Sequence, residues 1–454
     1  MLQLHFPGSA SPLPLPELAA KSWPAILLFY LAPWFLLVDS ISGALQSLPL
    51  ALPWSLFYKA VLLTLLVWQL ILWRDKALLL LVGLLLLALT GPLYSYLTLP
   101  VLQNAGAAGF AGNELPVLLK ALAPLLAFRF YQQFCARYPV GFTVMTDRLM
   151  LLSFLVIQLN LALGLAGFGD TAYQPMDNVA QSFLGLKGFF YSTNELAAVL
   201  LVVSGWLLWR SWPLNKACFV AVSLLTIGSA ILLLTKTGLL GSVLLVTFIP
   251  LLSARPGFWR QHRKILLSCL LLLLSAVLLL LWYAEPVLRA AGIYDKLAYA
   301  YQQRGVAGIV LSSRDLYLTV IWQQTEQHYS GLHRLFGVGV AGVSVLLKKY
   351  FIEIDLFDLM VFYGIAGALI FGLTFGHFIY ACSRRLYEHP LAATVLFINV
   401  LLLGVSMFAG HILTSGMLWL PWALLNAAVF NQRLISPLAS TMPNVARGPD
   451  ERLT

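Results

Sequence analysis

Apolar runs long enough to cross a membrane follow one another along almost the whole chain. A transmembrane helix needs about 20 mainly apolar residues, because it rises about 1.5 Å per residue through a hydrocarbon core about 30 Å thick. Such runs lie at residues 23–43, 52–73, 77–97, 115–134, 149–168, 194–212, 216–235, 238–253, 265–284, 354–381, 390–409 and 411–430. The pattern predicts an all-α integral membrane protein of about twelve transmembrane helices.

One connection between these runs is much longer than the others. Residues 285–353 separate the predicted ninth and tenth helices, and loops of this length in compact proteins usually carry function. Their periodicity predicts two amphipathic helices, at about 286–303 and 313–328, before a Gly-rich stretch at 331–342. The chain therefore divides into a tail (1–22), nine helices (23–284), the large loop (285–353), three helices (354–430) and a second tail (431–454).

The positions of Lys and Arg predict the orientation. Short cytoplasmic loops of membrane proteins are enriched in these residues. Basic clusters occur in alternate loops, at Arg74/Lys76, Arg137/Arg148, Arg210/Lys216, Arg255–Lys264 and Arg384/Arg385. We therefore expect a multi-pass protein of a bacterial inner membrane, with both termini cytoplasmic and the large loop outside.

Composition narrows the class further. Only 10% of the residues are charged and 60% are hydrophobic, which is too little charge for the surface of a soluble protein. The net charge of +10 is spread over the loops without a nucleic-acid motif, so no nucleic-acid partner is expected. The four cysteines lack CxxC spacing, and phosphate-binding, HExxH and GxSxG motifs are missing, so we expect neither a metal nor a cofactor.

Charged residues near the outer ends of the helices are the candidates for chemistry, because charges at membrane depth are costly. Lys59 and Lys120 lie one to two turns inside the outer boundary; they either extend to the headgroups or form a basic wall for a lipid phosphate. Lys187, Asn194 and Glu195 precede or begin the sixth helix. Ser192 and Glu195 have the spacing of a capping box, so a purely structural role for them is equally open.

Two further segments resemble helix starts with a cation beside them. Thr235-Lys236-Thr237-Gly238 places Lys236 and Thr237 at a helix N-terminus, where backbone N–H groups favour an anion. Arg314 follows Ser312 and Ser313, either of which would cap a helix. A cation in the first turn opposes the helix dipole, so Arg314 is expected to meet a ligand or to pair with an acid, Asp315 or Glu353.

The start of the tenth helix is unusually acidic. Glu353, Asp355 and Asp358 occupy six residues, which exceeds what capping requires. One of them is expected to hold a catalytic Arg and another to remove a proton from a hydroxyl. His328 and His333, in the preceding loop, compete for the role of base.

Several of these motifs together resemble the O-antigen ligase/polymerase (Wzy-type) superfamily of membrane glycosyltransferases. The similar pieces are GFFYSTNELA at 188–197, TKTG at 235–238, SSRD at 312–315, FGVG at 336–339 and EIDLFDLMVFYGIAG at 353–367. Their order, and the large outer loop before the tenth helix, match the family more specifically than any one motif. The resemblance implies a GT-C-like fold.

The resemblance also implies an activity. Such enzymes transfer a glycan from undecaprenyl pyrophosphate to a hydroxyl of an acceptor glycan or glycolipid, without nucleotide or metal. The positions that match the family are Arg314, Lys236 and the Asn194/Glu195 pair. Together with the residue patterns described above, we expect catalytic roles for Arg314, Glu353, Asp355, Asp358 and His333, and substrate binding by Lys187, Asn194, Glu195, Lys236, Thr237, Lys59 and Lys120. Membrane lipids and a chain-length regulator are the other expected partners.

Two alternatives remain beside an exopolysaccharide, capsule or O-antigen polymerase. Ligases of the family are expected to carry a histidine near the start of the helix after the large loop, where this chain has Glu353 and Asp355. This departure favours a polymerase over a ligase that attaches polymer to lipid A-core. A flippase of lipid-linked sugars would instead show charges at the membrane midplane and broken helices.

Overall fold

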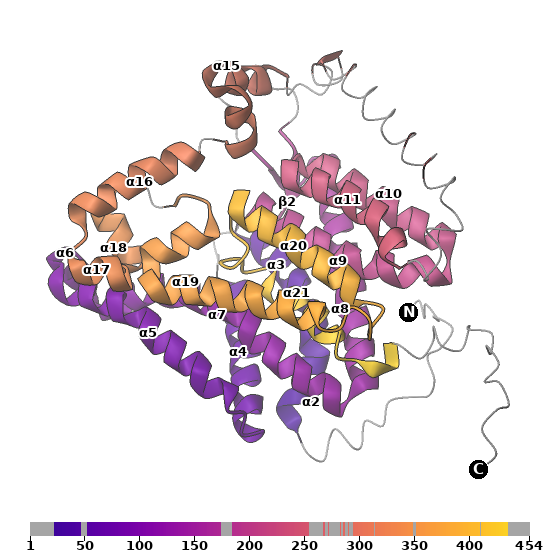
Figure 1. Cartoon of the computed structure of the whole chain (residues 1–454), viewed down its shortest axis with the longest axis horizontal. Helices are drawn as coiled ribbons and strands as arrows, with labels where there is room; N and C mark the ends of the chain where they lie inside the picture. The colour runs from indigo at the N-terminus through magenta and orange to yellow at the C-terminus, as the bar shows by residue number, and fades with distance from the viewer. Residues whose placement is uncertain are drawn as a thin grey trace, which may run out of the picture.

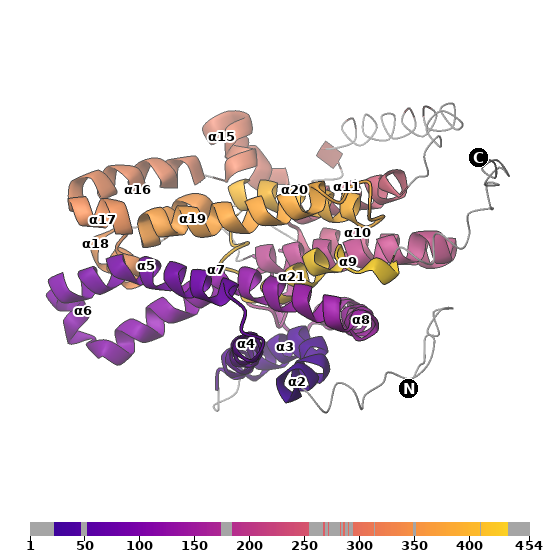
Figure 2. The same cartoon turned by 60° about the horizontal axis from the view of Figure 1, so that its bottom comes forward.

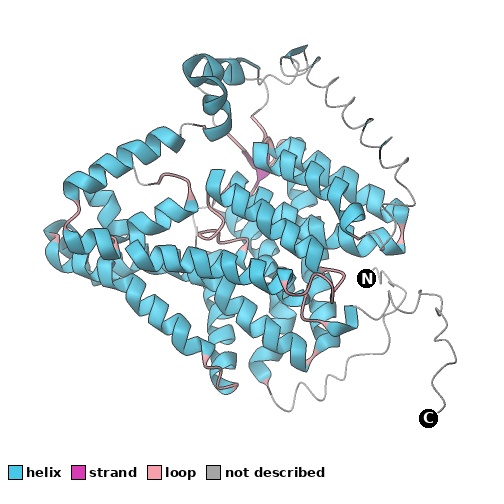
Figure 3. Cartoon of the chain, in the orientation of Figure 1, coloured by secondary structure: helices cyan, strands magenta, loops and turns pink. Residues whose placement is uncertain are grey.

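The computed structural model describes residues 22–46, 52–173, 184–253, 294–312, 314–347, 351–408 and 410–434, with isolated positions between 254 and 293. Almost all of them are helical, and the described part contains one small sheet (Figure 3). In it β1 (Asp170–Thr171) pairs antiparallel with β2 (Leu186–Gly188). The prediction of an all-α integral membrane protein is confirmed.

The helices of the first half follow the apolar runs. They are α2 (Trp23–Leu31), continued by η1 (Ala32–Trp34) and α3 (Phe35–Leu45), then α4 (Trp54–Leu72), α5 (Ala77–Thr98), the short α6 (Pro100–Asn104), α7 (Gly106–Arg137), α8 (Pro139–Leu165), α9 (Thr193–Leu214), α10 (Lys216–Leu233) and α11 (Lys236–Leu252). The run expected to be the ninth transmembrane helix, 265–284, lies outside the described residues. Among those described, eight helical spans are long and apolar enough to cross a membrane.

The last apolar run differs from its expected structure. After α19 (Asp355–Ser383) and α20 (Ala392–Phe408), the expected helix over 411–430 is helical only in α21 (Trp419–Ala428), before η2 (Gln432–Leu434). Ten helical residues extend about 15 Å, half of the hydrocarbon thickness. Residues 410–418 form turns and are mostly buried, so protein groups must satisfy their backbone.

Apart from isolated positions, the described part of the large loop starts at residue 294 and contains four helices. They are α15 (Tyr294–Leu311), α16 (Arg314–His328), α17 (Gly331–Phe336) and α18 (Gly339–Leu346). The Gly-rich stretch thus forms two short helices, joined where Gly337 has φ +75° and lies against the backbone of Phe362. Figures 1 and 2 both place α17 and α18 beside α6 and the adjoining end of α5, with α16 leading from them toward α15. α15 is joined to α16 by the ion pair of Arg304 with Asp315 and to α11 by Lys236, which donates to the carbonyl oxygen of Ile309.

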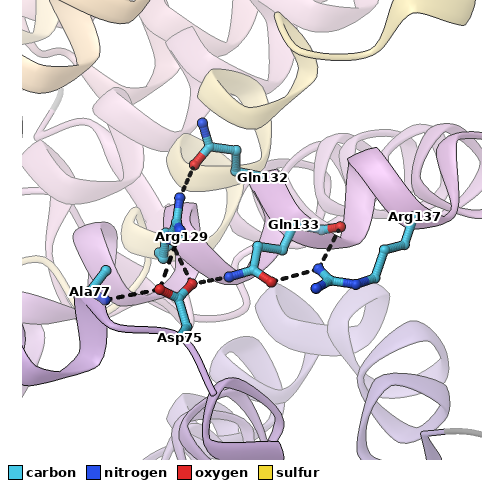
Figure 4. A network of polar contacts seen from close by, with 6 residues as sticks. All are labelled: Asp75, Ala77, Arg129, Gln132, Gln133 and Arg137. Carbon is cyan, nitrogen blue, oxygen red and sulfur yellow. Dashed lines mark hydrogen bonds and ion pairs between the residues drawn. The ribbon is translucent and has the colours of Figure 1, made fainter. Parts of the chain in front are cut away.

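A polar network joins the connection between α4 and α5 to the C-terminal part of α7 (Figure 4). Asp75 accepts hydrogen bonds from Arg129 Nε at 2.6 Å, Arg129 Nη2 at 3.2 Å and Ala77 N at 2.9 Å, and a further one from Gln133 Nε2. Because the carboxylate is buried, these donors replace the water it loses. The network therefore holds the connection between α4 and α5 against α7. The candidate site is built from other helix ends, which are described below.

Candidate functional site

The non-helical segment 410–416 is the centre of the candidate site. Asp355 Oδ2 accepts hydrogen bonds from the backbone N–H groups of Ile412, at 2.8 Å, and Leu413, at 3.2 Å. Glu195 Oε2 accepts from Ser415 Oγ, at 2.6 Å, and from Gly416 N, at 2.9 Å. Acids at the N-termini of α19 and α9 therefore supply partners that a continuous helix would have supplied itself.

Arg314 and Glu353 form an ion pair where the large loop joins α19. Arg314 Nη2 lies 2.8 Å from Glu353 Oε2, and the two side chains are 10% and 34% exposed. The position of Glu353 is fixed by buried Asp358, which accepts from Ile352 N at 2.7 Å and from Glu353 N at 3.0 Å. The pair joins the first turn of α16 to the segment before α19 and leaves part of the Glu353 carboxylate accessible.

Strained backbone surrounds this pair. Ser312, Glu353 and His411 have φ values of +51°, +66° and +61°, although none is glycine. Gly410 has φ +63°, and a Cβ there would lie 2.5 Å from the carbonyl oxygen of Glu353. A non-glycine residue in such a conformation costs about 1–3 kcal/mol and is found preferentially at functional sites.

His411 is a candidate that sequence reasoning missed. It lies close enough to Asp355 for their charges to interact, and its ring is 5.9 Å from that of Phe351. His411 is half-buried and so remains partly accessible. The signal in the sequence was the Gly410-His411 break in an otherwise apolar run, but its meaning depends on the fold bringing it to the start of α19.

Lys236 connects α11 to the residues just before Arg314. Its Nζ donates to Ser312 Oγ at 2.9 Å and to the carbonyl oxygen of Ile309. The helix starts as predicted, since Thr235 Oγ1 accepts from Gly238 N at 3.2 Å, and Thr237 is half-exposed in the first turn. Ser313, the other proposed cap of α16, lies outside the described residues.

Tyr173 adds an aromatic hydroxyl close to Arg314. Its hydroxyl donates to the carbonyl oxygen of Leu234 at 3.4 Å. Burial raises the pKa of Tyr173, and the positive charge of Arg314 opposes that rise. Tyr173 therefore stays protonated near neutral pH and can donate a hydrogen bond.

Lys59 and Lys120 meet at Gly416. A Cβ on Gly416 would lie 3.2 Å from Lys59 Nζ and 3.8 Å from Lys120 Nζ. Lys59 also pairs with Asp39 Oδ1 at 2.6 Å. The two lysines therefore lie together, at the end of the 410–416 segment that Glu195 also holds.

Lys187 and Asn194 are less closely connected with this centre. Lys187 Nζ donates to the carbonyl oxygen of Tyr191 at 3.3 Å and lies 3.8 Å from Asp170 Oδ2, within its own loop. Ser192 accepts from Glu195 N at 3.4 Å, so the predicted helix cap is present. The Asn194 side chain is half-exposed and makes no hydrogen bond with any residue that the structure describes.

His333 packs against α5. Its Nε2 lies 3.2 Å from Ser95 Oγ, and its ring is 5.0 Å from that of Tyr94 and 5.9 Å from that of Tyr329. Burial lowers the pKa of His333, so the ring is neutral near neutral pH. These contacts give His333 a role in holding α17 to the helical body.

Glu114 is a buried acid in α7 that sequence reasoning missed. Its Oε1 accepts from Ala341 N at 2.7 Å and so anchors the N-terminus of α18. A favourable interaction with that helix end offsets the cost of burying the carboxylate. Glu114 and His333 thus fix α18 and α17, the last two helices of the large loop. Residues 351–354, which include Glu353, follow α18 in the chain.

Part of the chain is similar to a known protein family. Residues 294–431 match the family model described as O-antigen ligase like membrane protein. The matched range contains the described loop helices, α19–α21, Arg314, Glu353 and the 410–416 segment. No curated protein and no solved structure gives a significant match.

The fold and site define an all-α membrane protein whose candidate chemistry lies where a helical loop meets the helix ends. The family match confirms the resemblance to the O-antigen ligase/polymerase superfamily. This similarity, over residues 294–431, is that of a membrane glycan-processing enzyme in a context of lipid-linked glycans.

Proposed function

We propose that the protein is a metal-independent membrane glycosyltransferase, a polysaccharide polymerase. It transfers an undecaprenyl-pyrophosphate-linked glycan to a hydroxyl of an acceptor glycan on the outer face of the inner membrane. Arg314 carries this proposal, because its nearly buried guanidinium is fixed beside a partly accessible carboxylate. A guanidinium can hold two oxygens of a pyrophosphate at once.

The reaction follows from these groups. The bond between the anomeric carbon and the phosphate oxygen breaks, the acceptor oxygen bonds to that carbon, and the acceptor proton passes to a base. Negative charge develops on the departing pyrophosphate, where Arg314 and the neighbouring Lys236 stabilise it. Each well-placed donor of this kind contributes about 3 kcal/mol in a site with little water.

Glu353 is the base that the geometry favours. Its carboxylate is one-third exposed, whereas those of Asp355 and Asp358 are buried and each accepts two backbone hydrogen bonds. A base must reach its proton directly or through one water molecule. Asp355 and Asp358 would then position Glu353 and the 410–416 segment without touching the proton.

A ligase is the second candidate function, and His411 is the observation that favours it. Family ligases are expected to have a histidine near the start of the helix after the large loop. In this chain the fold brings His411 to that place from a later segment, beside Asp355. His411 would then accept the proton instead of Glu353.

Carrier-linked glycans of a deletion strain distinguish the candidates. If the protein is a polymerase, single repeat units accumulate on the carrier in the outer leaflet. Long polymer on the carrier would indicate the ligase, and a lack of any outer-leaflet intermediate would indicate a flippase. Restoration of the wild-type glycan profile by the intact gene, but not by an Arg314→Lys variant, is the matched control.

A further inference from the structure

Two ammonium groups and the Glu195 carboxylate meet at Gly416, and a second carboxylate, that of Asp39, pairs with one of the ammonium groups. Lys59 Nζ and Lys120 Nζ lie within 4 Å of the position of a Gly416 Cβ. Asp39 is bound to Lys59, and Glu195 is bound to the Gly416 N–H. The charges of the four side chains cancel, which is unusual for a site that only binds anions.

These side chains retain hydrogen-bonding capacity that the protein does not use. Lys120 is half-buried in α7, and its ammonium makes no hydrogen bond or ion pair with any described residue. Asp39 accepts from Lys59 and from Ser55 through Oδ1, while buried Oδ2 has no partner in the described part. Glu195 uses Oε2 for Ser415 and Gly416, which leaves Oε1 available.

The unused groups include both donors, on the Lys120 ammonium, and acceptors, on the Asp39 and Glu195 carboxylates. An ammonium only donates and a carboxylate only accepts, whereas a hydroxyl does both. Neighbouring hydroxyls of a sugar ring can therefore bridge Lys120 to Asp39 or Glu195. A phosphate group only accepts, and both carboxylates would repel it.

We propose that Asp39, Lys59, Lys120 and Glu195 form a subsite around Gly416 for the hydroxyl groups of a glycan, separate in role from Arg314, which takes the pyrophosphate. This inference rests on the proposed function and assigns its sugar-binding part. It replaces the expectation that Lys59 and Lys120 bind a lipid phosphate. The 410–416 segment joins the two parts, since it touches Glu353 at Gly410 and the lysines at Gly416.

Two variants of the full-length protein test this assignment. Lys120→Met removes the unpaired donor and keeps much of the side-chain length. Gly416→Ala removes no charge but adds a methyl group 3.2 Å from Lys59 Nζ and 3.4 Å from Lys120 Cε, so the Lys59 ammonium must shift by a few tenths of an ångström and the methyl group fills space between the two lysines. Gly404→Ala in α20 is the control, because nothing lies within 4 Å of a Cβ there.

The measurement is the dissociation constant for two probes, by native mass spectrometry of the protein in nanodiscs. One probe is undecaprenyl pyrophosphate without glycan, and the other is the carrier-linked glycan purified from the deletion strain. Lys120→Met and Gly416→Ala should each weaken binding of the carrier-linked glycan about tenfold, the effect of losing one hydrogen bond to a charged group. Neither should change binding of the bare carrier, and Gly404→Ala should change neither constant.

The other outcomes are equally decisive. Equal weakening for both probes would make the subsite a phosphate site, and no weakening in either variant would make it structural; both results overturn the inference. Arg314→Lys should weaken binding of both probes, because both contain the pyrophosphate. If Arg314→Lys does so while Lys120→Met has no effect, only the sugar subsite fails. If the wild-type protein binds neither probe, the proposed function fails as well.

Discussion

At the scale of single residues, the acids at the start of α19 fall into two kinds. Asp355 and Asp358 are buried and hold backbone N–H groups, whereas Glu353 is partly exposed and holds Arg314. The sequence predicted the crowding of the three acids and an Arg partner for one of them. It could not separate them, because Asp355 binds N–H groups 57 and 58 positions away in the chain.

The sequence likewise predicted an acidic partner for Arg314 without deciding which acid it is. Asp315 and Glu353 were both open as its partner, and the structure pairs Asp315 with Arg304 at 2.5 Å. That bond to Arg304 lowers the pKa of Asp315. The backbone of α15 leaves the helical conformation at Arg304. The periodicity of the sequence does not show this bend, so it could not predict that Asp315 pairs with Arg304 and leaves Glu353 to Arg314.

Substitutions should separate the two kinds of acid. Glu353→Gln keeps the shape of the side chain and removes its basicity, so turnover per folded molecule should fall about 100-fold or more. Asp358→Ala leaves two backbone N–H groups without their acceptor, which should lower the free energy of unfolding by about 2–3 kcal/mol. Steady-state turnover and thermal unfolding of the purified variants measure the two effects. An active Glu353→Gln together with an inactive His411→Ala would transfer the role of base to His411.

At the scale of elements, the segment 410–418 explains where the apolar pattern misled. Its residues are apolar enough to join α21 in one run, and most are buried in protein. The helix is replaced by turns because side chains of Asp355 and Glu195 satisfy its N–H groups. Hydropathy reports that the side chains of a segment favour an apolar environment and says nothing of its backbone conformation. The apolar pattern therefore located this run but could not show that its first part forms turns.

Gly410 tests how tightly this segment is fixed. Gly410→Ala places a side chain at φ +63° and a Cβ 2.5 Å from the carbonyl oxygen of Glu353. The backbone strain alone should lower the free energy of unfolding by about 1–3 kcal/mol, and the close contact adds to this loss. We expect a lower melting temperature and a large loss of turnover. The matched control is Gly372→Ala in α19, where nothing lies within 4 Å of an added Cβ. If both variants melt at the wild-type temperature, the close approach of Gly410 to Glu353 is not present.

The attachment of α17 should depend on pH through His333. Burial lowers its pKa, so the unfolded chain, in which a His titrates near pH 6.5, binds the proton more tightly than the folded protein does. This contribution to stability is complete above about pH 6.5 and is lost as the pH falls from there toward the lowered pKa. The melting temperature of the wild type should therefore fall from about pH 7.5 to about pH 5.5 more than that of His333→Phe, which keeps the ring contacts. An identical pH dependence of the two proteins would disprove this role.

At the scale of the whole molecule, the sequence predicted the membrane class and most helix positions, because long apolar runs have few other structures open to them. It also placed the candidate groups at one set of helix ends. The sequence placed Lys59 and Lys120 at a similar depth in two helices, and the fold brings their ammonium groups together at Gly416. Asp39, Glu114 and His411 were missed, since their roles arise from contacts between distant segments.

The orientation of the molecule is tested by cysteine labelling. The large loop is predicted outside, so a cysteine at exposed Gln302, in a background without native cysteines, should react with a membrane-impermeant reagent in intact cells. A cysteine at Tyr387, fully exposed between α19 and α20, should react only after permeabilisation. Reversed labelling of these two sites would reverse the orientation and place the site in the cytoplasm.

The central claim is that Arg314 serves the transfer of a glycan from a polyprenyl pyrophosphate, and release of that carrier tests it most directly. The purified protein is reconstituted in liposomes with the carrier-linked glycan and an acceptor glycan. We predict that the wild type releases undecaprenyl pyrophosphate as the glycan lengthens. Arg314→Lys keeps the charge without the planar fork and should be about 100-fold slower at an equal amount of folded protein. A matched Arg304→Lys, which alters the partly exposed pair with Asp315, should remain close to wild type. Carrier release by Arg314→Lys at the wild-type rate, or no release by the wild type, would contradict the account.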